Sequence, residues 1–274
     1  MNERIIGLQE WFETPAGQYL QDWEQARFDS AVADIFGYHA LQLGLPALDA
    51  LGANRMPHRW LANSHPESPA RADSPVRQAP SLLIDFAALP FPATSLDLVV
   101  MPHSLDCHAD PHAALREVAR VLVPEGRVVI CGFNPASLWG LRQRREALFR
   151  RWGLGRPILP ELGQTIGNWR LRDWLHLLDF EIETSHFGCY RPAVGSDKWL
   201  RRLGWMDRLG ARWWPIFGAV YFVVAVKRVH GVRLMGPAWK KVASRASNSL
   251  PVANRNSDNP LVQRQEQEPF IESR

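Results

Sequence analysis

The 274-residue chain is 46% hydrophobic and 22% charged, a balance that excludes a wholly disordered protein. Its net charge of +4 is unevenly spread: residues 1–137 hold 9 Lys/Arg and 16 Asp/Glu, whereas residues 138–274 hold 23 and 12. Three scattered cysteines are too few for a disulfide framework and fit no zinc motif, so we expect a reducing compartment.

The first part of the chain alternates predicted helices and strands. Hydrophobic periodicity predicts a helix over 15–36, a strand over 39–43, a brief helix over 46–52 and a strand over 58–62. Residues 63–80 contain four prolines, which neither a helix nor a central strand tolerates at that spacing, so this segment is expected to be a loop.

The alternation continues to about residue 226. Further strands are predicted over 81–85, 96–101, 127–133, 181–187 and 219–226, and further helices over 111–122, 136–152 and 169–178. This order predicts an α/β fold with a doubly wound, mostly parallel sheet, in which ligands bind beyond the carboxyl ends of the strands. We expect one domain over 1–235 and a disordered tail over 236–274, where periodicity is lost.

One block carries a family resemblance. Residues 85–133, DFAALPFPATSLDLVVMPHSLDCHADPHAALREVARVLVPEGRVVICGF, run in the order of an acid, LPF, a strand, a His-rich turn, a helix-turn and a strand. This block resembles the central part of class I S-adenosylmethionine-dependent methyltransferases, in the subgroup that includes small-molecule methylases. The following GFNPASLWGLR, 132–142, resembles a poorly characterised bacterial branch, and the resemblance extends weakly over about residues 14–230.

The resemblance implies a cofactor, S-adenosylmethionine, and residues to hold it. Gly44 matches the start of the family's glycine-rich turn, where backbone amides bind the cofactor carboxylate. Asp85 matches the acid that accepts a hydrogen bond from the adenine amino group, and Phe86 would pack on the adenine ring. Met101 ends a strand below the expected position of the methionine moiety.

The glycine-rich turn departs from the family pattern. Gln42 replaces the family's acid and is assigned to the cofactor site by position, while Pro46 and Leu48 replace later glycines. No acid follows the second strand to bind the ribose hydroxyls, where the sequence offers only Asn63. We therefore expect methyl transfer to a small, apolar molecule, with a catalytically inactive binding or membrane-associated module as the alternative.

Three residues are candidates for work on the substrate. His103 and His108 are candidate general bases, because neutral imidazole is available near pH 7, and Asn134 is placed to orient a polar group. A cluster of five side chains resembles a metal site but matches no standard spacing, so no metal is expected; it comprises His103, Asp106, His108, Asp110 and His112.

The basic second half contains most of the twelve tryptophans. As one helix, residues 196–214 would place Trp199, Leu203, Met206, Leu209 and Trp213 on one face, with the basic side chains elsewhere. We expect a lid inserted at about 188–214, and two interpretations stay open: a cap packed on the core, or peripheral contact with anionic lipid.

The N-terminus and the longest apolar run indicate where in the cell the protein is located. The N-terminus reads unlike a signal peptide, and the longest apolar run, Trp213–Val226, is too short for a membrane span. We therefore expect a cytoplasmic protein, with peripheral contact at the inner membrane as one of the two interpretations of residues 196–214. Nucleic acid is an unfavoured partner, because no recognition motif accompanies the basic charge.

Overall fold

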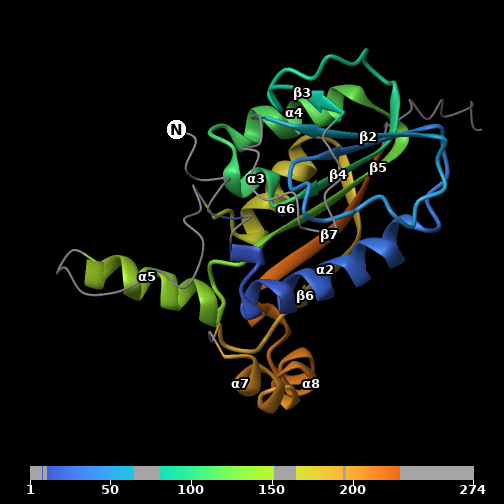
Figure 1. The fold of residues 1–274 in the computed structure, drawn as a ribbon. Helices are drawn as coiled ribbons and strands as arrows, with labels where there is room; N and C mark the ends of the chain where they lie inside the picture. The colour runs from blue at the N-terminus through green and yellow to red at the C-terminus, as the bar shows by residue number, and fades with distance from the viewer. Residues whose placement is uncertain (1–7, 9–10, 65–80, 151–164, 194–195, 229–274) are drawn as a thin grey trace, which may run out of the picture. The chain divides into compact units, whose positions relative to one another are not determined.

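The computed structural model describes residues 8, 11–64, 81–150, 165–193 and 196–228, all within the compact unit that spans residues 1–231 (Figure 1). The tail predicted over 236–274 lies outside the described residues.

A seven-stranded sheet forms the middle layer. Its strands are β1 (His39–Leu43), β2 (His58–Asn63), β3 (Leu82–Leu83), β4 (Leu96–Pro102), β5 (Leu122–Phe133), β6 (Phe180–Gly188) and β7 (Val220–Lys227). They lie in the order β3-β2-β1-β4-β5-β7-β6. All neighbouring pairs are parallel except the two that involve β7, which runs antiparallel to both β5 and β6.

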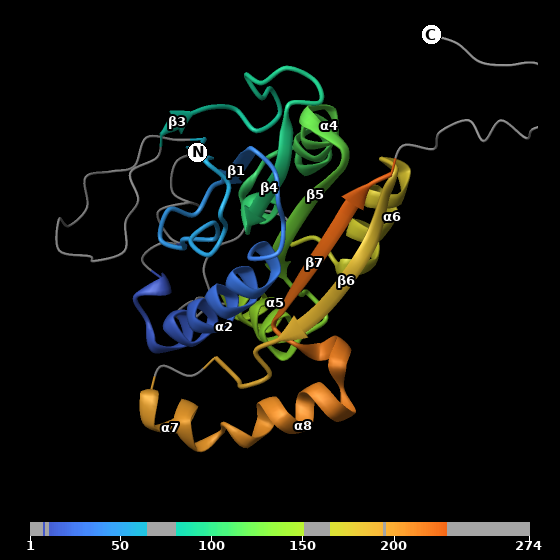
Figure 2. The ribbon, with the colours of Figure 1, turned by 90° about the vertical axis from the view of Figure 1, so that its right-hand side faces the viewer.

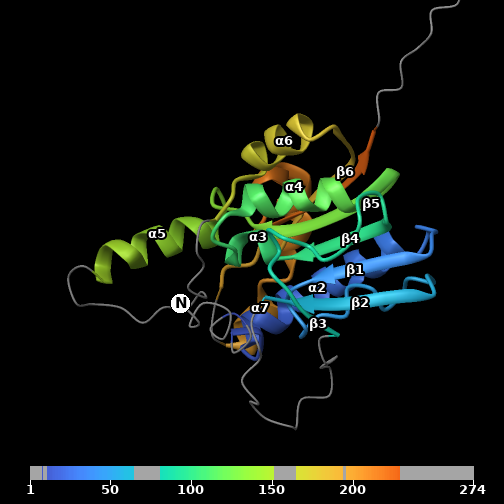
Figure 3. The ribbon, with the colours of Figure 1, turned by 90° about the horizontal axis from the view of Figure 1, so that it is seen from above.

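Helices cover both faces of the sheet (Figure 3). They are α2 (Pro15–Val32), α3 (Ser104–Cys107), α4 (Pro111–Val121), α5 (Leu138–Arg150), α6 (Asn168–Leu177), α7 (Asp197–Arg202), α8 (Trp205–Trp213) and the 3₁₀ helix η1 (Pro215–Phe217). One hydrophobic core packs α2 on one face, and a second packs α4 and α6 on the other. The predicted doubly wound, mostly parallel α/β fold is therefore confirmed.

Local sequence signals explain where the main helices begin. The Thr14 hydroxyl accepts a hydrogen bond from the Gly17 N–H, and Pro15 occupies the first turn of α2. The Asp110 carboxylate caps α4 in the same way, through the Ala113 N–H at 2.9 Å, with Pro111 in the first turn. Each cap satisfies an amide that the helix leaves without a partner.

Several predicted elements differ in the structure. Residues 46–52 form turns instead of a helix, β3 is only two residues long, and β5 begins at Leu122 instead of 127. The single helix predicted over 196–214 is wrong, because the chain bends at Leu203 and Gly204 and forms α7 and α8. The short elements α3 and η1 were not expected, since four or three residues give no readable period.

The strand order reverses beside β1, which has β2 on one side and β4 on the other. In open α/β sheets, loops leaving two such strands turn to opposite faces and open a crevice at the carboxyl ends. The same edge carries α5, α7 and α8, because α5 follows β5 and the other two connect the end of β6 to the start of β7 (Figure 2). A ligand site is therefore expected at this edge.

Candidate functional site

A pocket lies at this reversal point. Its walls come from the loops after β1, β2, β3 and β4, from α3 and from the N-terminal segment: Leu8, Gly44, Leu45, Asn63, Ser64, Phe86, Pro102, His103, Ser104, Cys107 and His108. Its free volume is about 30 Å³, whereas pockets for small ligands usually measure about 300–1,000 Å³. Leu8 and Leu45 are both buried where they line it, so a ligand of nucleoside size must displace side chains here.

The turn after β1 is held by glutamine side chains. The buried Gln42 amide donates to the carbonyl oxygens of Leu48 at 2.7 Å and of Gly44 and Leu45 at 3.2 Å, and its oxygen accepts the Ala50 N–H. From α2, Gln21 donates to the Ala47 carbonyl oxygen and Gln25 to that of Asp49. Because carbonyls surround Gln42, this turn requires a donor where the family pattern has an acceptor-only acid.

Gly44 has the backbone conformation that its position demands. Its φ is +76°, and an added Cβ would lie 3.1 Å from the Ser104 hydroxyl. Its N–H, however, donates to the Ala62 carbonyl oxygen at 2.7 Å and extends the β1–β2 pairing. In this structure the Gly44 amide is thus committed to the sheet and does not point to a ligand carboxylate as the glycine-rich turn implied.

The end of β2 supplies an unpaired donor. Asn63 is buried and lines the pocket, and its Oδ1 accepts the Ser64 N–H, but its Nδ2 has no hydrogen-bond partner among the residues that the structure describes. Leaving a buried amide unsatisfied costs about 1–3 kcal/mol. A hydroxyl-bearing ligand in the pocket would satisfy it.

Asp85, Phe86 and His108 form one group at the pocket rim. The Asp85 carboxylate accepts the Ala87 N–H at 2.9 Å and lies 3.3 Å from His108 Nε2, and 66% of its side chain is exposed. The Ala87 hydrogen bond, followed by that of His108, holds the pKa of Asp85 below its usual value. The Phe86 and His108 rings stack with centroids 5.9 Å apart. An ionised acceptor and an aromatic face thus stand side by side.

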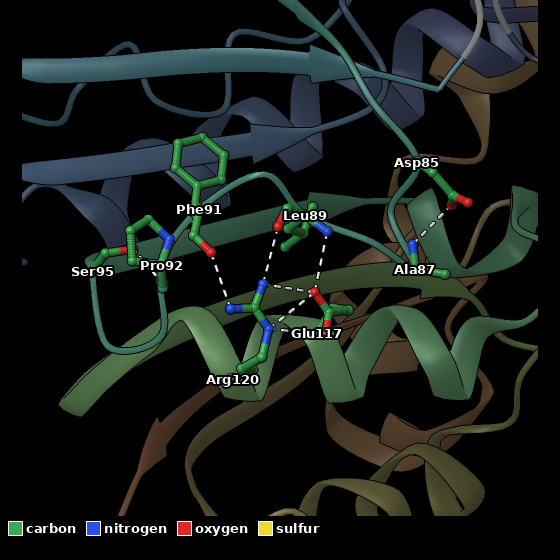
Figure 4. A network of polar contacts seen from close by, with 8 residues as sticks. All are labelled: Asp85, Ala87, Leu89, Phe91, Pro92, Ser95, Glu117 and Arg120. Carbon is green, nitrogen blue, oxygen red and sulfur yellow. Dashed lines mark hydrogen bonds and ion pairs between the residues drawn. The ribbon is translucent and has the colours of Figure 1, made fainter.

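The loop that carries this group is tied to α4 (Figure 4). Arg120 donates to the carbonyl oxygens of Leu89 and Phe91, both at 3.0 Å, and pairs with Glu117 at 2.8 Å. Glu117 in turn accepts the Leu89 N–H at 3.1 Å. Glu117 and Arg120, the E-x-x-R pair of the family-like block, thus hold the loop after Asp85 in position and do not line the pocket.

His103 lies in a fully buried network behind the pocket. Its Nε2 is 2.7 Å from Glu24 Oε1 and its Nδ1 is 3.2 Å from Asp106 Oδ2, which also accepts the Phe133 N–H. Burial alone would lower the pKa of His103, but Glu24 and Asp106 outweigh burial and raise the pKa to about 9. With both ring nitrogens engaged and the ring protonated at neutral pH, His103 in this state holds structure and accepts no proton.

The other sequence candidates lie in different settings. Met101 is fully buried in the core beside α4 and does not line the pocket. The Asn134 amide donates to the carbonyl oxygens of Ile216 at 2.7 Å and Gly218 at 2.9 Å, tying η1 to the end of β5. His108 is at the pocket rim, so its role as a base remains a prediction, as does any contact of Asn134 with a substrate.

One set of metal-type donors comes together among the described residues, and it differs from the His-rich cluster of the sequence. Atoms of Glu24, His103 and Cys131 lie within 4.8 Å of one another. The Cys131 thiol donates to Glu24 at 3.3 Å, and burial raises its pKa well above the usual range. Glu24 Oε1 thus contacts both the Cys131 thiol and the His103 ring. The expected absence of a metal remains a prediction.

Sequence reasoning missed several residues that shape the site. Glu24 lies on α2, 79 positions before His103, and nothing local pairs them. In the sequence, Gln21 and Gln25 are typical of any exposed helix surface, and Leu8 and Leu45 are typical of any hydrophobic core. Their residue types therefore gave no indication of a role at the site. Ser104, two residues after the end of β4, is the one residue of this kind whose position near a strand end was a signal.

Comparison with known proteins identifies the family. A family model described as a methyltransferase domain matches residues 62–130. The uncharacterised protein YafS of Escherichia coli is 30% identical over 180 residues, which cover 66% of this chain and 68% of that protein. The chain belongs to the class I S-adenosylmethionine-dependent methyltransferase superfamily. Its cofactor is therefore S-adenosylmethionine and its reaction class is methyl transfer.

Other methyltransferases resemble this chain over shorter stretches of sequence or in fold alone. A demethylmenaquinone methyltransferase of Mycolicibacterium paratuberculosis is 41% identical over 61 residues, 22% of this chain and 26% of that enzyme. An S-adenosylmethionine-dependent methyltransferase from Thermotoga maritima has a TM-score of 0.53 and 13% identity, over 80% of this chain and 94% of that one. This last likeness shows the fold alone.

The residues present fit the nucleoside half of this cofactor. Asn63 offers an unpaired buried donor, Asp85 an exposed ionised acceptor, and Phe86 an aromatic face. The turn after β1 fits the amino-acid half less well, because side-chain amides occupy its carbonyls and the Gly44 N–H is already used. No described helix is both long and apolar enough to cross a membrane.

Proposed function

We propose that the chain transfers a methyl group from S-adenosylmethionine to a small, apolar molecule at the pocket beside Gly44, Asp85 and Ser104. The observation that carries this proposal is the unpaired Asn63 amide beside an accessible Asp85 carboxylate, at the point where the strand order reverses. A sulfonium is already an activated methyl donor. The protein's part is therefore to align it with the acceptor and exclude water.

Each residue has a proposed role at the nucleoside end. Asn63 Nδ2 donates to a ribose hydroxyl, and Asp85 accepts from the adenine amino group after His108 moves aside. Phe86 packs against the base, and the Glu117–Arg120 pair keeps that loop in place. His108, at the rim, is the remaining candidate to accept a proton from an acidic acceptor group.

Replacing Asp85 with alanine is expected to weaken binding of S-adenosylhomocysteine by about 1–3 kcal/mol, or roughly 5- to 150-fold in Kd, because the adenine amino group loses its acceptor. Isothermal titration calorimetry measures this directly. Asp85→Asn keeps one acceptor oxygen and should lose less, and Asp173→Ala removes an exposed carboxylate from α6 as a control. Unchanged affinity in Asp85→Ala would remove Asp85 from the site.

A second candidate function is a catalytically inactive module that keeps the scaffold. It is supported by the free volume of about 30 Å³ and by Leu45 lining the pocket where the family turn is glycine-rich. The same titration separates the two functions. Neither heat nor a thermal shift at millimolar S-adenosylhomocysteine would favour the inactive module.

Peripheral contact with an anionic membrane is proposed through α7 and α8. Trp199, Trp205 and Trp213 expose 56%, 58% and 67% of their surface on this segment. Arg201 and Arg202 are exposed beside them. Tryptophan with flanking basic side chains is the pattern of a segment that lies at the headgroup level.

We expect the protein to sediment with anionic vesicles at low salt, and the bound fraction to fall several-fold when Arg201 and Arg202 are both changed to Glu. Arg170→Glu with Arg172→Glu makes the same change in net charge on α6 and should leave binding nearly unaltered. Wild-type protein recovered in the supernatant with and without vesicles would contradict membrane contact.

A further inference from the structure

A second cavity lies between α5 and the α8–η1 segment, at the sheet edge that carries the carboxyl ends. It is lined by Leu138, Leu141, Tyr190, Trp205, Met206, Leu209, Gly210, Trp214 and Phe217, which we call the tryptophan groove. Its volume is about 370 Å³, within the range of ligand pockets. It is more than ten times as large as the free volume at the reversal point.

The groove offers almost no hydrogen bonding to an occupant. The Tyr190 hydroxyl donates to the Pro215 carbonyl oxygen at 2.8 Å, so the ring alone faces the cavity. Gly210 lets α8 lie directly on that ring, because an added Cβ would sit 2.3 Å from Tyr190 Cγ. A polar ligand would lose hydrogen bonds to water here and gain none in return, which is unfavourable. Burial of a hydrocarbon chain in the same place is favourable.

The walls of the groove are fixed to the sheet edge. Asn134 binds the carbonyl oxygens of Ile216 and Gly218, and Trp139 of α5 donates to the Arg191 carbonyl oxygen at 2.6 Å. Asn134 directly follows Phe133, whose ring lies 4.3 Å from that of His103. The end of β5 thus contacts the groove wall through Asn134 and, through Phe133, contacts His103, which lines the pocket of the proposed methyl donor.

The surface around the groove is apolar and positively charged. Leu138, Leu141 and Trp214 expose 51%, 53% and 60% of their surface. Residues 138–145 and 197–217 together contain eight Lys/Arg and two Asp. Of the two acids, Asp207 pairs with Arg191 at 2.8 Å. The segments that line the apolar groove therefore carry a net positive charge, which attracts an anionic head group.

We propose that the tryptophan groove binds the hydrocarbon chain of an anionic amphiphile, and that such a molecule is the methyl acceptor. This inference rests on the proposed function for the acceptor role, but the binding itself requires no cofactor. The chain lies in the groove, the basic side chains of α8 hold the acidic head group, and the acceptor atom is directed toward the end of β5.

The test is direct binding of 11-(dansylamino)undecanoic acid below its micelle concentration, followed by energy transfer from tryptophan to the dansyl group. We expect saturable binding that weakens about tenfold or more when Leu138 and Leu141 are both changed to Glu. Leu177→Glu makes one such leucine-to-glutamate change on α6, at a side chain that is 75% exposed, and should keep affinity within about twofold. Circular dichroism melting checks that all variants are folded.

The methyl ester of the probe separates the two parts of the proposal. Arg208→Glu should weaken the acid several-fold and leave the ester almost unaffected, whereas the leucine variants should weaken both. No saturable binding, or equal losses in the leucine variants and Leu177→Glu, would overturn the proposal. The probe assay contains no cofactor, so a negative result would not contradict cofactor binding as measured by the S-adenosylhomocysteine titration. A negative titration, in turn, would not contradict binding of the probe in the groove.

Discussion

Changing Gln42 to glutamate is expected to lower the free energy of unfolding by about 3–5 kcal/mol at neutral pH. The substitution is nearly isosteric, so packing is retained. It exchanges an amide that donates to the carbonyl oxygens of Gly44, Leu45 and Leu48 for a buried carboxylate that faces the same three oxygens. Urea unfolding followed by circular dichroism measures the loss.

The loss should depend on pH and on position. Burial raises the pKa of the new carboxyl group in the folded protein above its unfolded value of about 4.3. The destabilisation therefore grows as the pH rises from about 4.3 to the pKa of the folded protein. Gln21→Glu is the matched control, since Gln21 is only half buried and donates to one carbonyl, and it should cost about 1 kcal/mol. Equal losses in the two variants would show that Gln42 has no special place in the turn.

The buried His103 network should give the protein a steep alkaline decline in stability. The pKa of His103 is raised to about 9 in the folded chain and is about 6.5 when unfolded. Between these values the folded state binds more protons, so its stability falls as pH rises. This contribution is fully present below pH 6.5 and lost above pH 9; it falls by about 1.4 kcal/mol per pH unit, about 3 kcal/mol in all.

The comparison variant is His103→Asn, because asparagine tolerates the left-handed backbone at this position, where φ is +53°. Subtracting its pH profile of unfolding free energy from that of the wild type isolates the titration of His103. Glu24→Gln should flatten the same window and cost about 3–5 kcal/mol at pH 6.5, since it leaves a buried imidazolium with Asp106 alone. Parallel profiles for wild type and His103→Asn would refute the charged network.

Much of the fold could be predicted because its signals are local. Proline and aspartate at the start of α4, the apolar run of β4 and the period of α2 all lie within short windows. Where the predicted secondary structure was wrong, contacts between residues distant in the sequence determine the structure. Residues 46–52 make turns because Gln21, Gln25 and Gln42 take carbonyl bonds that a helix would have used within itself.

The site was predicted less completely for the same reason. Asp85 and Phe86 could be placed by order along the chain, because they follow a strand at the ligand edge. His103 was assigned from that order too, but its environment is set by Glu24, which is close only after folding. Asn134 also follows a strand, yet its amide is used by η1, a segment 82 positions away.

The glutamine-held turn has a consequence for what the protein distinguishes among nucleosides. The backbone groups that would meet the charged amino-acid end of the cofactor are already bonded within the chain. If the proposed function is correct, recognition would then depend on the purine and the sugar, at Asp85 and Asn63. On the same proposal, a thionucleoside that lacks the amino-acid end is expected to compete with the full cofactor almost equally, so nucleoside by-products of the cofactor would inhibit this protein.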